Sequence, residues 1–165
     1  MHQIFSELES ILSDETRLYH EIYKLEKEKT EAAIEKKGSM IQELSANQEM
    51  LLFKIESLES ERTKVLAILS EKTDLKAGST LSEITSLFDA QSSARIMKCG
   101  TELKNVIIKL REKQEANKKL LQDNIEFFEI LISDLKNSSS LKSGYGSDGK
   151  EKSRVVNPVL FNTKA

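Results

Sequence analysis

The chain has 165 residues, of which 38% are hydrophobic, 32% charged and 5% aromatic, with one proline and no tryptophan. This length suits one domain plus a tail, and the many Glu, Lys, Leu and Ile residues favour long amphipathic helices over a thick globular core. Lys and Arg number 25 against 27 Asp and Glu, so the net charge of -2 supplies no basic field for nucleic acid or an anionic membrane.

The single cysteine, Cys99, has no internal partner for a disulfide, which suits a reducing cytoplasm. The first residues lack the basic start and apolar stretch of a secretory signal, and no run approaches the ~20 apolar residues of a membrane span. We therefore expect a cytoplasmic protein that is not inserted into a membrane and that acts on partner proteins.

An apolar heptad seam, the row of a and d positions of a coiled-coil helix, begins near the amino terminus and predicts a first helix to about Lys37. Its positions are Ile4, Leu8, Ile11, Glu15, Leu18, Ile22, Leu25, Lys29 and Ala32. Glu15 and Lys29 are charged interruptions of this seam.

The end of the first helix is rich in charge. From Lys24 to Lys37 the charges alternate in sign, which predicts a solvent-facing stretch laced with ion pairs rather than a nucleic-acid site. Gly38 and Ser39 indicate a turn, in which the glycine ends one helix in a left-handed conformation and the serine caps the next. A continuous bent helix remains the alternative.

The same stepping restarts after the turn and predicts a second long helix, antiparallel to the first. Its seam positions are Ile41, Leu44, Gln48, Leu51, Ile55, Leu58, Arg62, Val65 and Leu69. Arg62 has two interpretations: it lays its stem along the seam and pairs with a facing carboxylate, or it orients a partner protein.

A short helix and a third long helix are expected next. Residues 80–83 (TLSE) have the S/T-x-x-E pattern of a capping box and predict a helix from Leu81 to about Phe88. Residues 91–93 (QSS) predict a joint. The third long helix is expected from about Ala94 to Lys136, with Gly100 as its weakest point.

The third long helix is apolar over more than one stripe, which is wider than packing on a single neighbour requires. We expect part of the excess to be core and part to be a docking face for amphipathic helices of a client protein. Asn117 and Asn124 lie on its seam, where a buried amide lowers stability but can enforce register. The predicted client-binding residues are Ile107, Leu110, Asn117, Leu121, Phe128 and Leu131 on this helix, and Leu160 and Phe161 in the tail.

After Lys136 the composition becomes rich in Ser and Gly, which predicts a tail that is disordered when free. The expected fold is therefore all-α. Residues 1–136 form an antiparallel helical hairpin, a short helix and a third long helix in a coiled-coil-like bundle, and residues 137–165 form a flexible tail.

The ionisable residues do not suggest an enzyme, and we expect no catalytic residue, metal or cofactor. A di-metal site in a helical bundle needs Glu-x-x-His pairs, and the residue three before His20 is Arg17. His20 is expected to be solvated, and Cys99 to be a half-buried residue of ordinary reactivity.

Five short motifs, in their order along the chain, resemble the FlgN family from end to end. They are LESER (58–62), LSEI (81–84), QEANKKLL (114–121), YG (145–146) in the Gly- and Ser-rich tail, and LFNTKA (160–165). The resemblance implies a cytosolic chaperone that binds the carboxy-terminal helices of the hook–filament junction proteins FlgK and FlgL. Such a chaperone prevents early assembly of these subunits and delivers them to the flagellar type III export gate.

By the same resemblance, Tyr145 helps the complex dock on the export gate component FlhA, and the alternative is an aromatic residue in a linker. A second hypothesis for the whole chain comes from its regular second helix. It is a structural coiled-coil tether or scaffold that acts by self-association.

Overall fold

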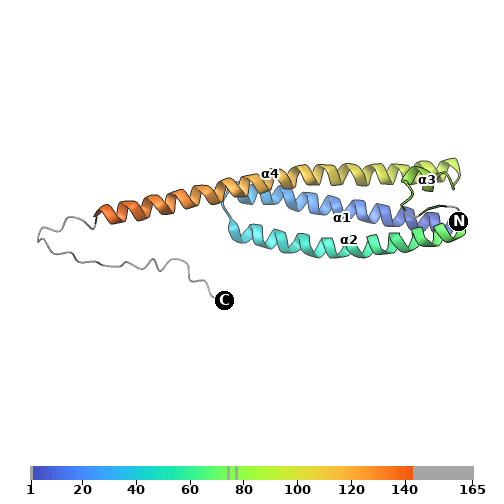
Figure 1. The fold of residues 1–165 in the computed structure, drawn as a ribbon, viewed down its shortest axis with the longest axis horizontal. Coiled ribbons are helices and arrows are strands. Elements are labelled where there is room, and N and C mark those ends of the chain that lie inside the picture. The colour runs from blue at the N-terminus through green and yellow to red at the C-terminus, as the bar shows by residue number, and fades with distance from the viewer. Residues whose placement is uncertain (1, 74, 77, 143–165) are drawn as a thin grey trace, which may run out of the picture. The chain divides into compact units, whose positions relative to one another are not determined.

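The computed structural model describes residues 2–73, 75–76 and 78–142, with side chains described up to residue 136. This part of the chain is all-α: its helices are α1 (His2–Ile34), α2 (Gly38–Lys72), α3 (Leu81–Thr85) and α4 (Ala90–Lys142) (Figure 1). The fold class predicted from the heptad seams is confirmed. The chain divides into unit 1, residues 1–124, and unit 2, residues 125–165, and we describe each unit by itself.

In unit 1, α1 and α2 form the expected antiparallel hairpin (Figure 1). The polar interruptions of the two seams face each other across it. Arg62 Nη1 donates to Glu15 Oε2 at 3.1 Å, and Lys29 Nζ donates to Gln48 Oε1 at 2.8 Å. A residue early in α1 thus meets one late in α2, which fixes both the antiparallel direction and the register.

Helix α4 runs parallel to α1 within unit 1. Arg95 Nε donates to Glu9 Oε1 at 2.7 Å near the start of both helices. Farther along, Asn117 Nδ2 donates to the backbone oxygen of Glu26, also at 2.7 Å. Because the residue numbers rise together in both helices, unit 1 is an up-down-up bundle of α1, α2 and α4.

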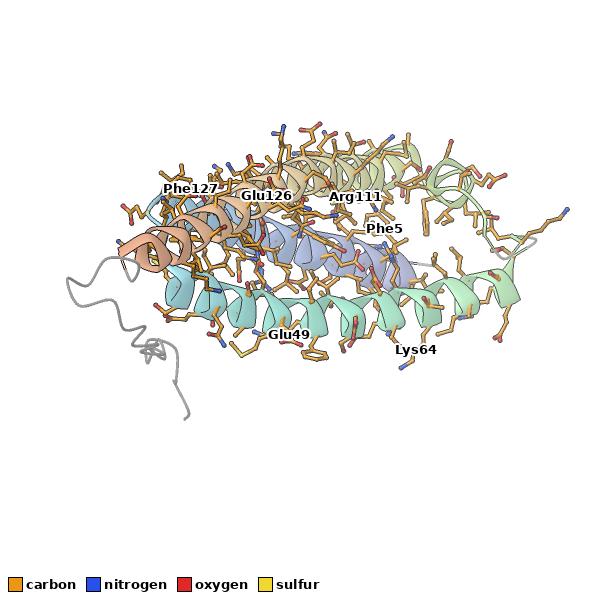
Figure 2. All side chains as sticks on the ribbon, turned by 60° about the vertical axis from the view of Figure 1, so that its left-hand side comes forward. Phe5, Glu49, Lys64, Arg111, Glu126 and Phe127 are labelled. Atoms are coloured by element: carbon orange, nitrogen blue, oxygen red, sulfur yellow. The ribbon has the colours of Figure 1, made fainter. Side chains whose placement is uncertain are left out.

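Helix α1 is central because it contacts both long neighbours. Besides the seam toward α2, it buries a second stripe that includes Phe5, Leu12 and Ala33. The Phe5 ring lies 5.6 Å, centroid to centroid, from that of Phe88, and Figure 2 shows Phe5 among the helices of the bundle. A single heptad seam therefore describes α2 better than it describes α1.

Two apolar clusters form the core of unit 1. The larger joins the beginning of α1, the end of α2, α3 and the beginning of α4. Its buried members are Ile4, Phe5, Leu8, Ile11, Leu12, Val65, Leu69, Ile84, Ile96, Leu103 and Val106. The smaller consists of Leu18, Ile22, Ile55 and Leu110.

The turn between α1 and α2 forms by a different route from the one expected. The left-handed residue is Lys36, with φ of 56°, while Gly38 is the first residue of α2 and does not adopt a left-handed φ. Lys37 N donates to Ala32 O at 2.8 Å and Lys36 N to Ala33 O at 3.2 Å, the two bonds of a Schellman motif. Ser39 lies inside α2 and is not its cap, so both assignments at this turn were wrong, while the turn itself is confirmed.

The capping box of α3 is confirmed. Glu83 N donates to Thr80 Oγ1 at 3.3 Å, and Thr80 N donates to Glu83 Oε2 at 2.6 Å. The helix ends at Thr85, earlier than predicted. Gly100 lies against α3, and a Cβ at this position would displace the end of the Leu81 side chain.

Helix α4 begins earlier than predicted. Asp89 Oδ1 accepts hydrogen bonds from the backbone N–H groups of Gln91 and Ser92, both at 3.0 Å, so residues 91–93 lie in the first turn rather than in a joint. A hydrogen bond from the Ser92 side chain, together with the backbone bonds from Ser92 and Gln91, holds the pKa of Asp89 below its usual range. The sequence signal was an aspartate directly before the helix, which reads as an N-cap.

Helix α4 continues to Lys142 and so includes residues 137–142 of the segment expected to be tail. The predicted flexibility of the remaining tail, together with Tyr145, Leu160 and Phe161, concerns residues 143–165, which lie outside the described residues.

Candidate docking face for partner helices

The structure separates the predicted client-binding residues by burial. Leu110 and Asn117 are buried in unit 1, and Ile107 and Leu121 are half-buried. In unit 2, Phe128 is 45% exposed and Leu131 is 40% exposed. Client contact at these positions stays a prediction, but only Phe128 and Leu131 expose a large share of their apolar surface, which a partner could reach without opening the bundle.

Asn117 belongs to a buried polar layer that joins all three long helices of unit 1. Its Nδ2 donates to Glu26 Oε1 at 2.9 Å, and Gln48 Nε2 donates to Glu26 Oε2 at 2.5 Å. Thr30 Oγ1 donates to Asn117 Oδ1 at 2.7 Å. The Glu26 carboxylate thus accepts one bond from α4 and one from α2, so this layer sets the register of the bundle.

Glu26 and Lys29 correct the expectation that the charged end of α1 faces solvent. Glu26 is 4% exposed, and Lys29 lies 3.8 Å from it, Nζ to Oε2, as well as bonding Gln48. The alternating charges of this stretch did not predict the buried polar layer. The heptad seam could have predicted it, because Lys29 and Gln48 occupy a or d positions, which face the neighbouring helix.

A second buried charge lies at Glu15, which is 1% exposed. Arg62 pairs with Glu15 Oε2, as one interpretation of the seam arginine predicted, while Oε1 has no hydrogen-bond partner. Burial raises the pKa of Glu15, Arg62 partly opposes that rise, and nearby Glu59 adds to it. The pair therefore specifies register at some expense of stability near neutral pH.

Unit 2 presents the candidate docking face on α4. Every described side chain from residue 125 to 136 is exposed, although seven of these are large and apolar. They are Ile125 59%, Phe127 46%, Phe128 45%, Ile130 61%, Leu131 40%, Ile132 45% and Leu135 68% exposed. We call the face formed by these residues the 125–135 face. The client-binding residues predicted from the sequence include only Phe128 and Leu131 of this set.

The 125–135 face is wide. At 100° per residue, its apolar side chains spread over more than half of the helix circumference, and Glu126 and Glu129 occupy much of the remaining arc. Figure 2 labels Glu126 and Phe127 at the beginning of this segment. Large exposed apolar patches are typical of sites that bind other proteins. Because this face is broad, it could contact several apolar side chains of a client helix, or more than one client segment.

The described residues bear on three predictions from the sequence, which concern metal sites, membrane-spanning helices and the single cysteine. Among them, no group of three or more His, Cys, Asp and Glu side chains could hold a metal ion, and none of their helices is long and apolar enough to cross a membrane. Cys99 is half-buried, and burial raises the pKa of its thiol, which lowers its reactivity at neutral pH.

Unit 1 closes its own core, and unit 2 presents a broad exposed apolar helix face, a combination typical of proteins that bind helices of partners. The family model for the FlgN protein matches residues 1–153, and the chain therefore belongs to the FlgN family. This is a family of flagellar export chaperones, which bind flagellar proteins. Comparison with curated proteins and with solved structures gave no match.

Proposed function

We propose that this protein is a cytoplasmic type III export chaperone for the carboxy-terminal helices of FlgK and FlgL, and that it holds them on the 125–135 face. The observation that carries the proposal is the exposure of large apolar side chains on this face, with Ile125 at 59% and Ile130 at 61%. Membership of the FlgN family supports the role in export.

The physics of such a face suits temporary storage of a client. A segment that is disordered before assembly folds onto the face as an amphipathic helix, which covers the surface the segment needs for assembly. Burying one large apolar side chain contributes about 1.5–3 kcal/mol, so several must be buried to exceed the cost of coupled folding, about 2–5 kcal/mol. This folding cost lowers the net affinity, which favours release of the client at the export gate.

The remaining predicted residues divide into three groups. Ile107 and Leu121 are half-buried in unit 1, and their contact with the client remains a prediction. Leu110 packs in the smaller core cluster and Asn117 in the polar layer, which favours support of α4 over client contact as their role. Leu160 and Phe161 as client contacts, and Tyr145 as a contact of FlhA, remain predictions from the sequence.

Titration calorimetry with carboxy-terminal peptides of FlgK and FlgL tests the proposal, with the corresponding flagellin peptide as the control. We expect a Kd of about 1 μM or tighter for a junction-protein peptide, with a negative heat-capacity change from apolar burial. Equal binding of flagellin would contradict the client class. Lack of binding by all peptides would withdraw the chaperone assignment.

The tether hypothesis is tested separately by sedimentation. A structural tether is a stable dimer or larger species at micromolar concentration, because its seams close by self-association. A chaperone of the proposed kind sediments as a monomer with an apolar face available. A stable dimer that binds no junction-protein peptide would make the tether the better account.

A further inference from the structure

We propose that the chain's own segment 150–161 docks on the 125–135 face when no client is bound. Both parts belong to unit 2, and the segment follows α4 in the same chain. If the face also serves as the client site, which rests on the proposed function, then the segment and the client compete for one surface. The chain would carry an internal placeholder that protects its apolar face until a client arrives.

The first argument is composition. The segment reads KEKSRVVNPVLF, a basic stretch followed by five large apolar residues around Asn157 and Pro158. Exposed apolar surface on the helix and an apolar run in the following segment both gain by leaving water, at roughly 25 cal/mol per Å² of area buried. Pro158 lacks a backbone N–H and disfavours helix before it, so the segment would bind as an extended chain.

The second argument is charge. Residues 125–135 carry the carboxylates Glu126, Glu129 and Asp134 and no Lys or Arg. The segment begins with Lys150, Lys152 and Arg154 against the single acid Glu151. Opposite net charges therefore accompany the two apolar surfaces, which favours their association and defines an acidic rim for a basic strand.

The third argument is reach. From Lys142, the last residue of α4, to Ile130 is twelve residues of helix, about 18 Å at 1.5 Å per residue. The thirteen residues from Lys142 to Val155 can extend to about 43 Å. The linker is therefore longer than the distance it must span for the segment to reach the face. Its Gly and Ser residues allow the chain to reverse direction at a low free-energy cost.

Paramagnetic broadening in the full-length chain tests the docking. Cys99→Ser gives a cysteine-free chain, and Asn162→Cys then carries one nitroxide label beside the segment. We expect the methyl signals of Ile125, Ile130 and Ile132 to lose intensity. With the same label, Leu160→Ser together with Phe161→Ser should restore these signals, and Lys150→Glu with Lys152→Glu should restore them in part.

A mixed sample distinguishes docking within one chain from docking between two. Isotopically labelled protein without nitroxide is combined with nitroxide-labelled protein at natural isotope abundance. Broadening in this sample comparable to that in the singly labelled chain would show that the segment occupies a second copy, which overturns the proposal. Absence of broadening in the full-length labelled chain would overturn it as well.

Client titration tests the competition. Leu160→Ser with Phe161→Ser should raise the affinity for a junction-protein peptide about three- to tenfold, because the face is freed from its internal occupant. A fall in affinity would show that Leu160 and Phe161 contribute to client binding, which would overturn the proposed competition. If the broadening is seen but no client binds, the docking stands and the proposed function fails.

Discussion

At the scale of single residues, two buried carboxylates of α1 set the register of unit 1. Glu26 receives hydrogen bonds from both α2 and α4, whereas Glu15 has one oxygen paired with Arg62 and the other without a partner. A fully bonded buried carboxylate and a half-bonded one differ in what they do to stability. Removal of a hydrogen-bond partner of Glu26 should lower the free energy of unfolding. Glu15 should instead make the free energy of unfolding depend on pH.

Replacing Asn117 by Ala should lower the free energy of unfolding by about 1–3 kcal/mol, because the buried Glu26 carboxylate loses its donor from α4. The measurement is urea unfolding followed by circular dichroism. Asn105→Ala is the matched control, since Asn105 is an exposed asparagine on the same helix and should change stability by no more than about 0.5 kcal/mol. Equal losses in both variants would show that the polar layer contributes nothing specific.

Replacing Glu15 by Gln should remove a dependence of stability on pH. Burial raises the pKa of Glu15, so the folded chain holds this proton more tightly than the unfolded chain. As pH rises from the ordinary glutamate pKa of about 4.3 through the raised value, the wild type should lose stability relative to Glu15→Gln. Urea unfolding of both proteins across this pH range checks the difference, and parallel curves would contradict it.

At the scale of elements, the heptad pattern predicted the helices and their pairing, but not how they end. Seam positions such as Leu44, Ile55 and Leu69 are buried as expected, because an apolar period of 3.5 residues admits few other arrangements. The turn after α1 could not be placed by residue type, since the Schellman bonds put lysine rather than glycine in the left-handed conformation. The Asp89 cap could have been predicted, because an aspartate directly before a helix is a common N-cap, but the helix was predicted to begin later, at about Ala94.

Replacing Lys36 by Gly should therefore stabilise the hairpin by about 0.5–1 kcal/mol, because a left-handed backbone strains a residue with a Cβ. Thermal and urea unfolding give the measurement. Lys37→Gly is the control at the next position, where φ is -88° and glycine should only add flexibility to the unfolded chain. A gain from Lys37→Gly as large as that from Lys36→Gly would rule out this account of the turn.

At the scale of the whole molecule, the sequence predicted an export chaperone with an apolar third long helix, and it was less successful in choosing residues along that helix. One seam contains Leu110, Asn117, Phe128 and Leu131, and periodicity treats them alike. The structure buries the first two in unit 1 and exposes the last two in unit 2. Which part of a seam is core depends on where its neighbours end, a property of tertiary structure that periodicity along one helix does not contain.

The most direct test of the docking face compares two double variants in one calorimetric titration with the FlgK or FlgL peptide. Phe128→Ser with Leu131→Ser removes apolar area from the 125–135 face, and we expect client affinity to fall about 10- to 100-fold. Phe53→Ser with Leu52→Ser makes the same chemical change on α2, where these side chains are 63% and 46% exposed, and should leave affinity unchanged. Unchanged affinity in the first variant, with its helicity retained, or an equal loss in both, would contradict the account.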